Sequence, residues 1–192
     1  MQELKERIVK EGKVLPGNII KVDGFLNHRI DTELLGHIAE EFGKYFNMDE
    51  VTMILTAEAS GIALATAVAS RFHKPMIFAK KAKSDNIEGG LYQSDIYSYT
   101  YKKKVTLLVS KEWLSSSDRV LIIDDFMANG EAMRGLCDIV TAAGATLVGI
   151  GCAVEKGFQG GGDRLRAAGV NLKSLAIIES AEPGNIVFRD DD

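Results

Sequence analysis

The stretch Val120-Leu121-Ile122-Ile123-Asp124-Asp125-Phe126-Met127-Ala128-Asn129-Gly130-Glu131-Ala132 decides the fold. Four apolar residues deliver the adjacent carboxylates Asp124 and Asp125 to a short loop, and a helix is expected over residues 130–143. A continuous apolar run of this kind is typical of a strand that is buried on both faces of a parallel sheet. We therefore expect the two carboxylates at the carboxyl end of such a strand, where parallel α/β sheets bind their ligands.

The loop after the carboxylates has the chemistry of a phosphate site. A loop that leads into a helix offers unpaired backbone N–H groups to an anion, and Gly130 allows the backbone to approach that anion closely. Adjacent carboxylates can accept hydrogen bonds from a vicinal diol such as ribose O2 and O3. An Asp-Asp pair that only caps a turn is the alternative, which the apolar strand and the following helix disfavour. The stretch predicts a ribose 5-phosphate site formed by Asp124, Asp125, Ala128, Asn129, Gly130, Glu131 and Ala132.

Apolar strands alternate with helices on both sides of this stretch. The expected strands are 51–57, 75–79, 105–109, 120–123 and 146–154, and the expected helices are 1–13, 31–46, the segment from Gly61 to Arg71, and 130–143. Residues 16–27 are expected to be irregular and residues 82–95 to form a mobile loop. The alternation predicts an α/β fold, in which helices flank a central, mostly parallel sheet.

Composition limits the class of protein. A chain of 192 residues with 46% hydrophobic and 26% charged residues fits one domain, and its net charge of −4 argues against a nucleic-acid surface. No stretch approaches the roughly 20 apolar residues that cross a bilayer. We therefore expect a cytoplasmic protein with no membrane or nucleic-acid partner. Cys137 and Cys152 are expected to be buried thiols, and the cysteines and histidines show no metal-ligand spacing.

Residues 120–130 resemble the motif that binds phosphoribosyl pyrophosphate (PRPP) in type I phosphoribosyltransferases. Their Asp-Asp-Phe-Met-Ala-Asn-Gly sequence is similar to the form found in bacterial xanthine phosphoribosyltransferases. Many family members carry hydroxyl residues where this chain has Asn129 and Ala132, although the Asn129 amide can still donate a hydrogen bond. Three further segments resemble the same subfamily in the same order: 21–28, 58–62 and 154–158.

The resemblance spans almost the whole chain and implies both an architecture and a reaction. The architecture is a single domain, 1–192, with a hood of approximately 1–35 and 160–192 over a PRPP-binding core of approximately 36–159. The reaction is the transfer of the 5-phosphoribosyl group from PRPP to xanthine in purine salvage, which releases pyrophosphate. The family implies a homodimer and Mg²⁺ bound through PRPP rather than by a protein metal site. Asp124 and Asp125 are then the catalytic residues.

Two alternatives to xanthine transfer remain open. One is a guanine or hypoxanthine phosphoribosyltransferase, because those bases share the 6-oxo group. The other is a PRPP-sensing regulator on the same fold, although the roughly 30 residues before the core carry no basic reading helix.

The pyrophosphate of PRPP is expected to lie against two segments that follow strands. Glu58, Ala59, Ser60 and Gly61 offer backbone N–H groups and a hydroxyl, unless they form a plain strand-to-helix turn. Lys80 and Lys81 are positioned to stabilise the charge that grows on the leaving group, unless they are ordinary surface lysines.

The purine is expected near Lys156, which ends the 146–154 strand. An ammonium donor suits a 6-oxo acceptor and opposes the 6-amino group of adenine, unless Lys156 is only a surface lysine. Phe158 can stack on the ring. By resemblance, Ile20 packs against the base and Asn27 hydrogen-bonds its 2-oxo edge. Residues 82–103, which include Tyr97, Ser98, Tyr99 and Tyr101, resemble the catalytic flap of the family, a lid that would exclude water.

Overall fold

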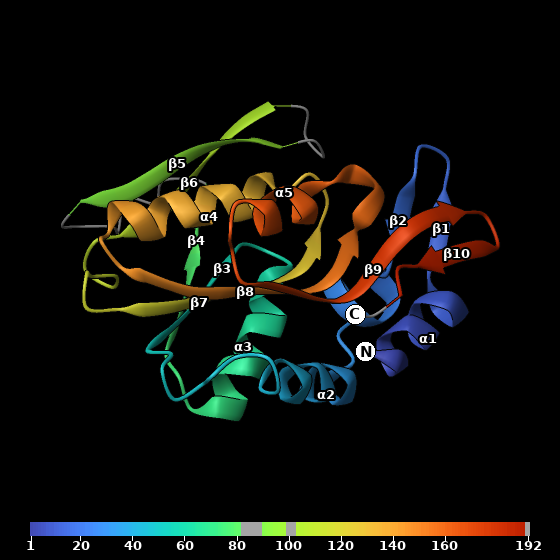
Figure 1. The fold of residues 1–192 in the computed structure, drawn as a ribbon, viewed down its shortest axis with the longest axis horizontal. Coiled ribbons are helices and arrows are strands. Elements are labelled where there is room, and N and C mark those ends of the chain that lie inside the picture. Colours follow the sequence, from blue (N-terminus) through green and yellow to red (C-terminus); the bar gives the residue numbers. More distant parts are fainter. Residues whose placement is uncertain (82–89, 99–102, 191–192) are drawn as a thin grey trace.

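The computed structural model describes residues 1–81, 90–98 and 103–190, and its centre is a six-stranded sheet (Figure 1). The strands are β3 (Met53–Ala57), β4 (Met76–Ala79), β7 (Arg119–Met127), β8 (Thr146–Lys156), β9 (Leu172–Glu182) and β10 (Asn185–Phe188). Across the sheet they follow the order β10-β9-β8-β7-β3-β4. All neighbours are parallel except β10, which runs antiparallel to β9. The expected α/β fold with a mostly parallel sheet is confirmed.

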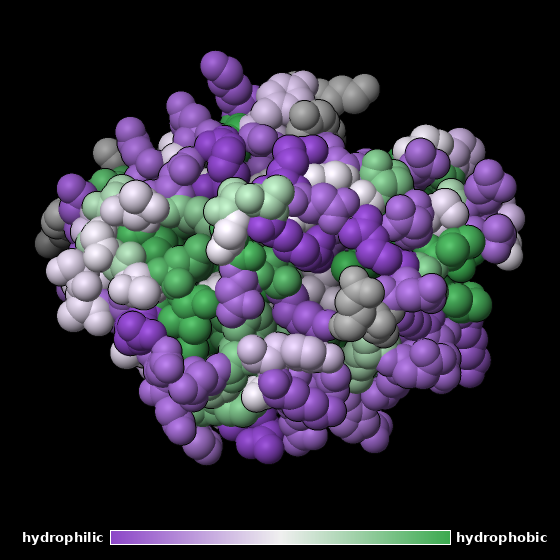
Figure 2. Space-filling model, viewed as in Figure 1, coloured by the Kyte–Doolittle hydropathy of each residue, from purple (hydrophilic) through white to green (hydrophobic). Residues whose placement is uncertain are grey.

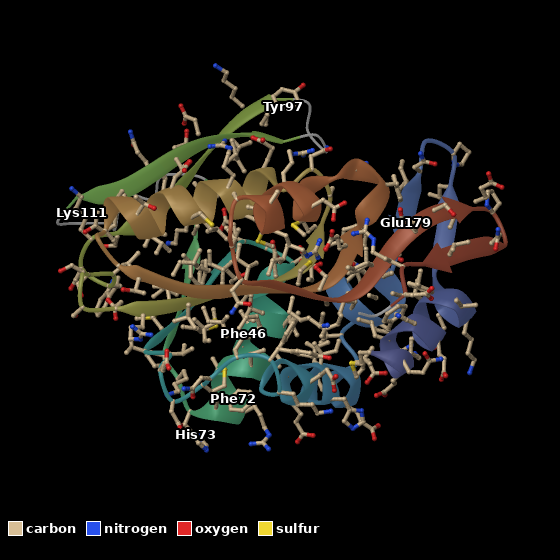
Figure 3. All side chains as sticks on the ribbon, viewed as in Figure 1. Phe46, Phe72, His73, Tyr97, Lys111 and Glu179 are labelled. Atoms are coloured by element: carbon tan, nitrogen blue, oxygen red, sulfur yellow. The ribbon has the colours of Figure 1, made fainter. Side chains whose placement is uncertain are left out.

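Helices cover both faces of the sheet, which explains why its central strands are apolar throughout (Figure 1). Helices α2 (Thr32–Phe42) and α3 (Gly61–Phe72) cover one face, and α4 (Glu131–Ala142) with α5 (Gly161–Ala167) covers the other. Asp31 caps α2 as expected, because its carboxylate accepts a hydrogen bond from the backbone of Leu34 at 3.1 Å. Two apolar clusters form the core, and Phe46 and Phe72 lie in the one beneath the sheet in Figure 3.

The amino-terminal segment lies beside β9 and β10 at one end of the sheet (Figure 1). It contains α1 (Gln2–Glu11), β1 (Lys13–Leu15), β2 (Ile19–Lys21) and a π-helical turn, η1 (Asp23–Asn27). The expectation of an irregular 16–27 segment is wrong in part, since β1 and β2 pair antiparallel. Gly17 and Asn18, with φ values of 83° and 59°, make the tight turn between them.

Another two-stranded sheet, separate from β1 and β2, packs on α4. It is the antiparallel hairpin of β5 (Leu91–Ser98) and β6 (Lys103–Ser110), so the expectation of a loop over 82–95 is wrong for its last part. Gly135 of α4 lets the hairpin approach closely: a Cβ there would lie 2.5 Å from Ile96 and 3.0 Å from Leu107. Residues 82–89 and 99–102, with Tyr99 and Tyr101 of the expected flap, lie outside the described residues.

Several expected boundaries differ from those of the structure. Helix α2 ends at Phe42 rather than 46, whereas β7 continues through both carboxylates to Met127 and β8 continues to Lys156. The chain beyond residue 158 forms the end of a short 3₁₀ turn, η2 (Gly157–Gln159), followed by α5, β9 and β10, none of which the patterns predicted.

The expectation of buried thiols is confirmed for Cys152 and wrong in part for Cys137. Hydrophilic residues cover most of the face shown in Figure 2. Cys152 is buried and Cys137 is half-buried, and both are free thiols. Within the described part of the chain, no helix is both long enough and apolar enough to cross a membrane.

Candidate functional site

Asp124 and Asp125 line a cavity of about 290 Å³ near the carboxyl end of β7. Strand β7 brings them there because its first residues are buried between the helical layers, so the chain leaves the core only after the carboxylates. Most of the predicted site residues line the same cavity: Asn27, Glu58, Ser60, Lys81, Asp124, Asp125, Ala128, Asn129, Gly130, Glu131 and Ala132. The structure therefore brings together residues from four segments of the chain.

The Asp125 carboxylate is held by two side chains from distant segments. Its Oδ1 accepts a hydrogen bond from the Ser60 hydroxyl at 2.8 Å, and its Oδ2 accepts one from the Asn27 amide at 2.9 Å. Only 2% of Asp125 is exposed, so these two donors replace the hydrogen bonds to water that the carboxylate loses when it is buried. Ser60, expected to contact pyrophosphate, and Asn27, expected to contact the base, both bind this carboxylate here.

Asp124 has a different environment. Burial raises the pKa of its carboxyl well above the ordinary value, and the neighbouring charge of Asp125 raises that pKa further. Lys81 acts in the opposite direction. The Oδ1 atom of Asp124 accepts a hydrogen bond from the backbone N–H of Asp125 at 3.0 Å. The pair thus presents one carboxyl that favours its neutral form beside one that accepts two hydrogen bonds.

Gly61 makes room for this carboxyl. A Cβ at position 61 would lie 2.4 Å from Oδ1 of Asp124 and 2.2 Å from the hydroxyl of Thr56, so no larger residue fits without displacing the site. Thr56 is fully buried, and its hydroxyl has no hydrogen-bond partner in the part of the chain that the structure describes. Gly61 does not itself line the cavity but packs against Thr56 and Asp124.

Glu58 and the two expected lysines have separate roles in the structure. The Glu58 carboxylate accepts a hydrogen bond from the backbone of Lys81 at 2.6 Å, and the peptide bond between Glu58 and Ala59 is cis. Lys81 lines the cavity, whereas Lys80 and Ala59 do not. The backbone of Lys80 pairs with Leu108, which joins the end of β4 to the hairpin.

The expected phosphate loop leads into α4, as the sequence predicted. Gly130 precedes the helix with a φ of 78°, a left-handed conformation that favours glycine. Two features from α5 support the loop from outside. The Arg164 guanidinium donates a hydrogen bond to the Asn129 carbonyl at 3.0 Å, and a Cβ on Gly161 would lie 2.4 Å from the Ala128 carbonyl.

Glu131 places an acidic group beside the expected phosphate. It is paired with Arg134 at 3.1 Å and accepts a long hydrogen bond from the backbone of Tyr97 at 3.4 Å. The hydrogen bond from Arg134 lowers the pKa of the Glu131 carboxyl. Glu131 therefore connects the phosphate loop to the β5–β6 hairpin, on which Figure 3 shows Tyr97.

Of the expected base-binding residues, Asn27 lines the cavity, whereas Ile20, Lys156 and Phe158 do not. Lys156 donates a hydrogen bond to the Asn18 carbonyl at 3.0 Å, and its ammonium lies 5.5 Å from the ring centroid of Phe126, which does line the cavity. Burial lowers the pKa of the Lys156 ammonium. Ile20 is buried and Phe158 is half-buried, and both pack against the core beneath the sheet.

Sequence reasoning missed some residues that line the cavity. Ile96 and Val105 of the hairpin and Phe126 of β7 face it, together with Ala57, Met127 and Met133. Phe126 sits directly after the carboxylates, and Ile96 lies between Asp95 and Tyr97, whose side chains point to the other face of a strand, a pattern that could have placed Ile96 on an inward face. Among the described residues, no group of three or more His, Cys, Asp or Glu side chains could hold a metal ion.

Comparison with known proteins identifies the family. A family model described as "Phosphoribosyl transferase domain" matches residues 26–168. This chain belongs to the phosphoribosyltransferase family. The segments from the cavity's first residue, Asn27, to Arg164 of the phosphate-loop support all lie within the match. The resemblance of residues 120–130 to a phosphoribosyltransferase motif is therefore confirmed at the level of the family.

Two phosphoribosyltransferases are similar to this chain over their whole length. The xanthine phosphoribosyltransferase of Lachnoclostridium phytofermentans is 53% identical over 193 residues, which cover 100% of each chain. That of Bifidobacterium animalis subsp. lactis is 53% identical over 192 residues, which cover 98% of this chain and 100% of the relative.

Solved phosphoribosyltransferase structures share the fold at lower identity. An adenine phosphoribosyltransferase from Giardia lamblia has a TM-score of 0.76 at 19% identity, covering 93% of this chain and 98% of that one. The enzyme from Trypanosoma brucei has a TM-score of 0.72 at 24% identity, covering 91% and 79%. These likenesses establish the arrangement of the sheet and helices.

Proposed function

We propose that this chain is a xanthine phosphoribosyltransferase of purine salvage, which converts PRPP and xanthine to xanthosine 5′-monophosphate and pyrophosphate. One observation carries the proposal: Asp124 and Asp125 line the same cavity as the loop 128–132 at the start of α4. Diol acceptors and phosphate-binding amides in one cavity suit ribose 5-phosphate. The high identity to xanthine phosphoribosyltransferases supports xanthine as the base.

The reaction breaks the bond between the anomeric carbon and a pyrophosphate oxygen. A ring nitrogen of the base then bonds to that carbon and loses its proton, and positive charge develops on the ribose during the exchange. Asp125 accepts a hydrogen bond from one ribose hydroxyl and stabilises this charge electrostatically. Asp124 lies beside it and accepts a hydrogen bond from the neighbouring hydroxyl. The scheme needs no covalent bond to the protein.

The leaving pyrophosphate lies toward the 58–61 segment. Ser60 and Lys81 line that side of the cavity, and Lys81 supplies positive charge to the departing group. Lys80 contributes from the end of β4, and the N–H groups of Ala59 and Gly61 are the backbone donors of this segment. These assignments rest on the position of the segment beside Asp125.

Magnesium fits the donor set of the cavity. Its carboxylates (Glu58, Asp124, Asp125 and Glu131) are hard oxygen donors, which Mg²⁺ prefers, and this ion is usually bound by one or two of them together with substrate phosphates. Mg²⁺ would be held chiefly by PRPP oxygens, beside Asp124 and Asp125. When bound, Mg²⁺ neutralises the leaving pyrophosphate.

The base lies toward Lys156. Its ammonium donates to the 6-oxo group, Phe158 and Ile20 contact the ring, and Asn27 binds the 2-oxo edge with the donor that Asp125 leaves free. Support for this arrangement comes from the position of Lys156 over Phe126 at the cavity edge.

A hood of residues 1–35 and 160–192 would enclose the base over a core of residues 36–159. We also propose a homodimer in the cytoplasm, and sedimentation analysis tests the dimer.

An assay with PRPP, Mg²⁺ and each of xanthine, guanine, hypoxanthine and adenine tests the proposal. Nucleotide formation is followed by chromatography, with pyrophosphate release as the second readout. We expect xanthine to give the highest kcat/KM and adenine to be rejected. Absence of nucleotide with every base, or a preference for adenine, would contradict the proposal.

A further inference from the structure

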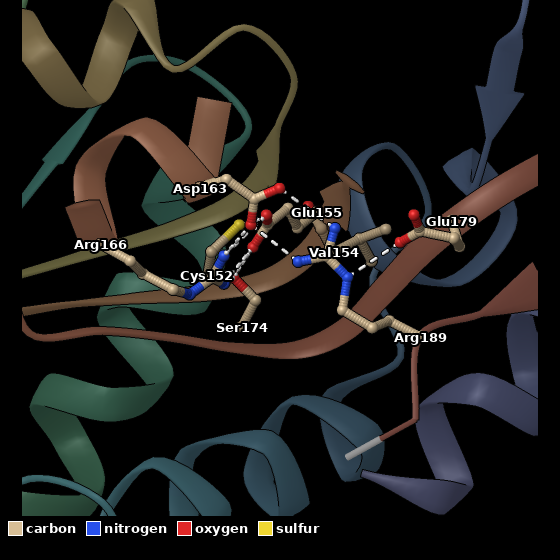
Figure 4. A network of polar contacts seen from close by, with 8 residues as sticks. All are labelled: Cys152, Val154, Glu155, Asp163, Arg166, Ser174, Glu179 and Arg189. Carbon is tan, nitrogen blue, oxygen red and sulfur yellow. Dashed lines mark hydrogen bonds and ion pairs between the residues drawn. The ribbon is translucent and has the colours of Figure 1, made fainter. Parts of the chain in front are cut away.

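A network of charged side chains extends from Glu155, next to the expected base-binding turn 156–158, to Arg189 (Figure 4). Its centre is Glu155, which is fully buried and directly precedes Lys156. Both terminal nitrogens of Arg166 bind the Glu155 carboxylate, at 2.6 and 3.1 Å, and the Ser174 hydroxyl donates to it as well. The end of β8 is therefore fixed by groups from α5 and β9.

The network continues from Glu155 to the last described residues of the chain. Asp163 accepts from Arg166 at 3.1 Å and from both terminal nitrogens of Arg189, at 2.7 and 3.1 Å. The Nε of Arg189 donates to Glu179 of β9 at 2.8 Å, and its backbone N–H donates to the Ile177 carbonyl. Arg189 thus joins α5 to the sheet through a planar, bidentate contact, which fixes orientation as well as distance.

Gly157 rests directly on this network. A Cβ at position 157 would lie 2.9 Å from Ile177, 3.1 Å from a terminal nitrogen of Arg189 and 3.2 Å from the Glu179 carboxylate. Gly162, after the turn, lies still closer to the network, since a Cβ there would lie 2.0 Å from Glu155. The network therefore contacts the chain before, within and after the base-binding turn.

We infer that Arg189 is a positioning residue that sets the affinity for the purine base by holding Gly157, and with it Lys156 and Phe158, in place. This inference rests on the proposed function of the turn. Arg189 does not line the cavity, so its effect must pass through the turn it supports. The PRPP side of the site lies on other segments, at Asp125 and the loop 128–132, and does not contact Arg189 in the described structure.

Arg189 suits the experiment better than Arg166. Removing Arg166 would leave the buried Glu155 carboxylate without its charged partner, which strongly destabilises a protein. Arg189 is 33% exposed, so water can replace part of its contacts when it is truncated. Arg119 provides a matched control, because it is 43% exposed and pairs with Glu50 at 2.6 Å at the opposite end of β7.

The experiment compares wild type with Arg189→Ala, Arg189→Lys and Arg119→Ala. Steady-state kinetics give kcat and KM for xanthine and for PRPP, and thermal unfolding gives Tm. We expect Arg189→Ala to raise KM for xanthine about tenfold, the scale expected when a contact group is misplaced by less than 1 Å. KM for PRPP should stay within about twofold of its wild-type value, well below the tenfold change expected for xanthine. Arg189→Lys should restore part of the xanthine affinity, since lysine keeps the charge without the fork.

The outcomes separate the inference from the proposed function. If wild type forms no nucleotide, the proposed function fails before Arg189 is considered. If wild type is active and Arg189→Ala matches Arg119→Ala in KM for xanthine, the inference is wrong. Equal rises in both KM values, with no restoration by Arg189→Lys, would show a general structural role and also overturn it. Should Arg189→Ala not fold, Arg189→Lys against Arg119→Lys decides by the same split between the two KM values.

Discussion

The Asn27 amide donates to Oδ2 of Asp125 over 2.9 Å, although 98 positions separate the two residues in the chain. Asn27 ends the amino-terminal turn η1, and Asp125 lies near the end of the central strand β7. The contact joins the segment expected to enclose the base to the carboxylates expected to hold the ribose. An amide has two N–H donors and one acceptor oxygen, so Asn27 retains groups for a second partner.

Replacement of Asn27 by Ala should weaken xanthine much more than hypoxanthine, because only xanthine carries a 2-oxo group. Loss of a hydrogen bond to a buried acceptor costs about 1–3 kcal/mol, or roughly 5- to 150-fold in kcat/KM. Kinetics with both bases measure the difference. Asn47→Ala, at an exposed position, is the control. Equal losses for the two bases would show that Asn27 acts only through Asp125.

Neutralising Asp124 and Asp125 together, as the double Asn variant, should lower kcat by roughly 10²–10³, as removal of other groups that stabilise developing charge does. The Asn oxygens keep the shape of the site and can still accept from Ser60 and from the backbone of residue 125. Circular dichroism checks the fold of the variant. Activity close to that of wild type would defeat the proposed mechanism.

The buried Asp124 predicts a dependence of stability on pH. The pKa of Asp124 is higher in the folded state than in the unfolded state, so the folded protein keeps this proton to a higher pH. The contribution of Asp124 to stability therefore falls as pH rises from the unfolded pKa to the folded pKa. Asp124→Asn removes the titration. The difference in unfolding free energy between this variant and wild type should therefore grow in favour of the variant from about pH 4 upward. Urea unfolding at a series of pH values measures it, and a constant difference would contradict the assignment.

Gly61→Ala should destabilise the protein by about 1–3 kcal/mol, since the added methyl group meets both Thr56 and Asp124. Gly36→Ala is the matched control: position 36 lies within helix α2 with open space around it. There alanine should stabilise by about 0.5–1 kcal/mol through its higher helix propensity. Chemical denaturation of both variants separates the two effects, and similar free energies for both would refute the close contact at Gly61.

Local pattern predicted the centre of this fold well. The apolar run 120–123 and the helix after Gly130 were correct because burial on both faces and a positive φ leave direct marks in sequence. The pairing of β1 with β2 was missed because each strand has only three residues. Strand β10 was missed for another reason: nothing local announces an antiparallel edge strand joined through a turn at Gly184. Strand β9 was missed although residues 175–178 form an apolar run.

The same distinction between local pattern and long-range packing applies to the candidate site. Residues that follow strands, such as Asp124 and Lys81, were placed correctly at the cavity because strand ends converge at one edge of a parallel sheet. Contacts between distant segments could not be read from the chain. The hydrogen bond from Arg164 to the Asn129 carbonyl and the network that reaches Arg189 depend on the packing of α5. No pattern in the sequence predicted that helix.

The close packing of Gly161 against the loop 128–130 has a consequence for protein engineering. A Cβ on Gly161 would lie 2.4 Å from the Ala128 carbonyl and 2.7 Å from the nitrogen of Gly130, so the start of α5 and the phosphate loop cannot be changed independently. A redesign that replaces this part of α5 therefore has to carry a matching phosphate loop with it.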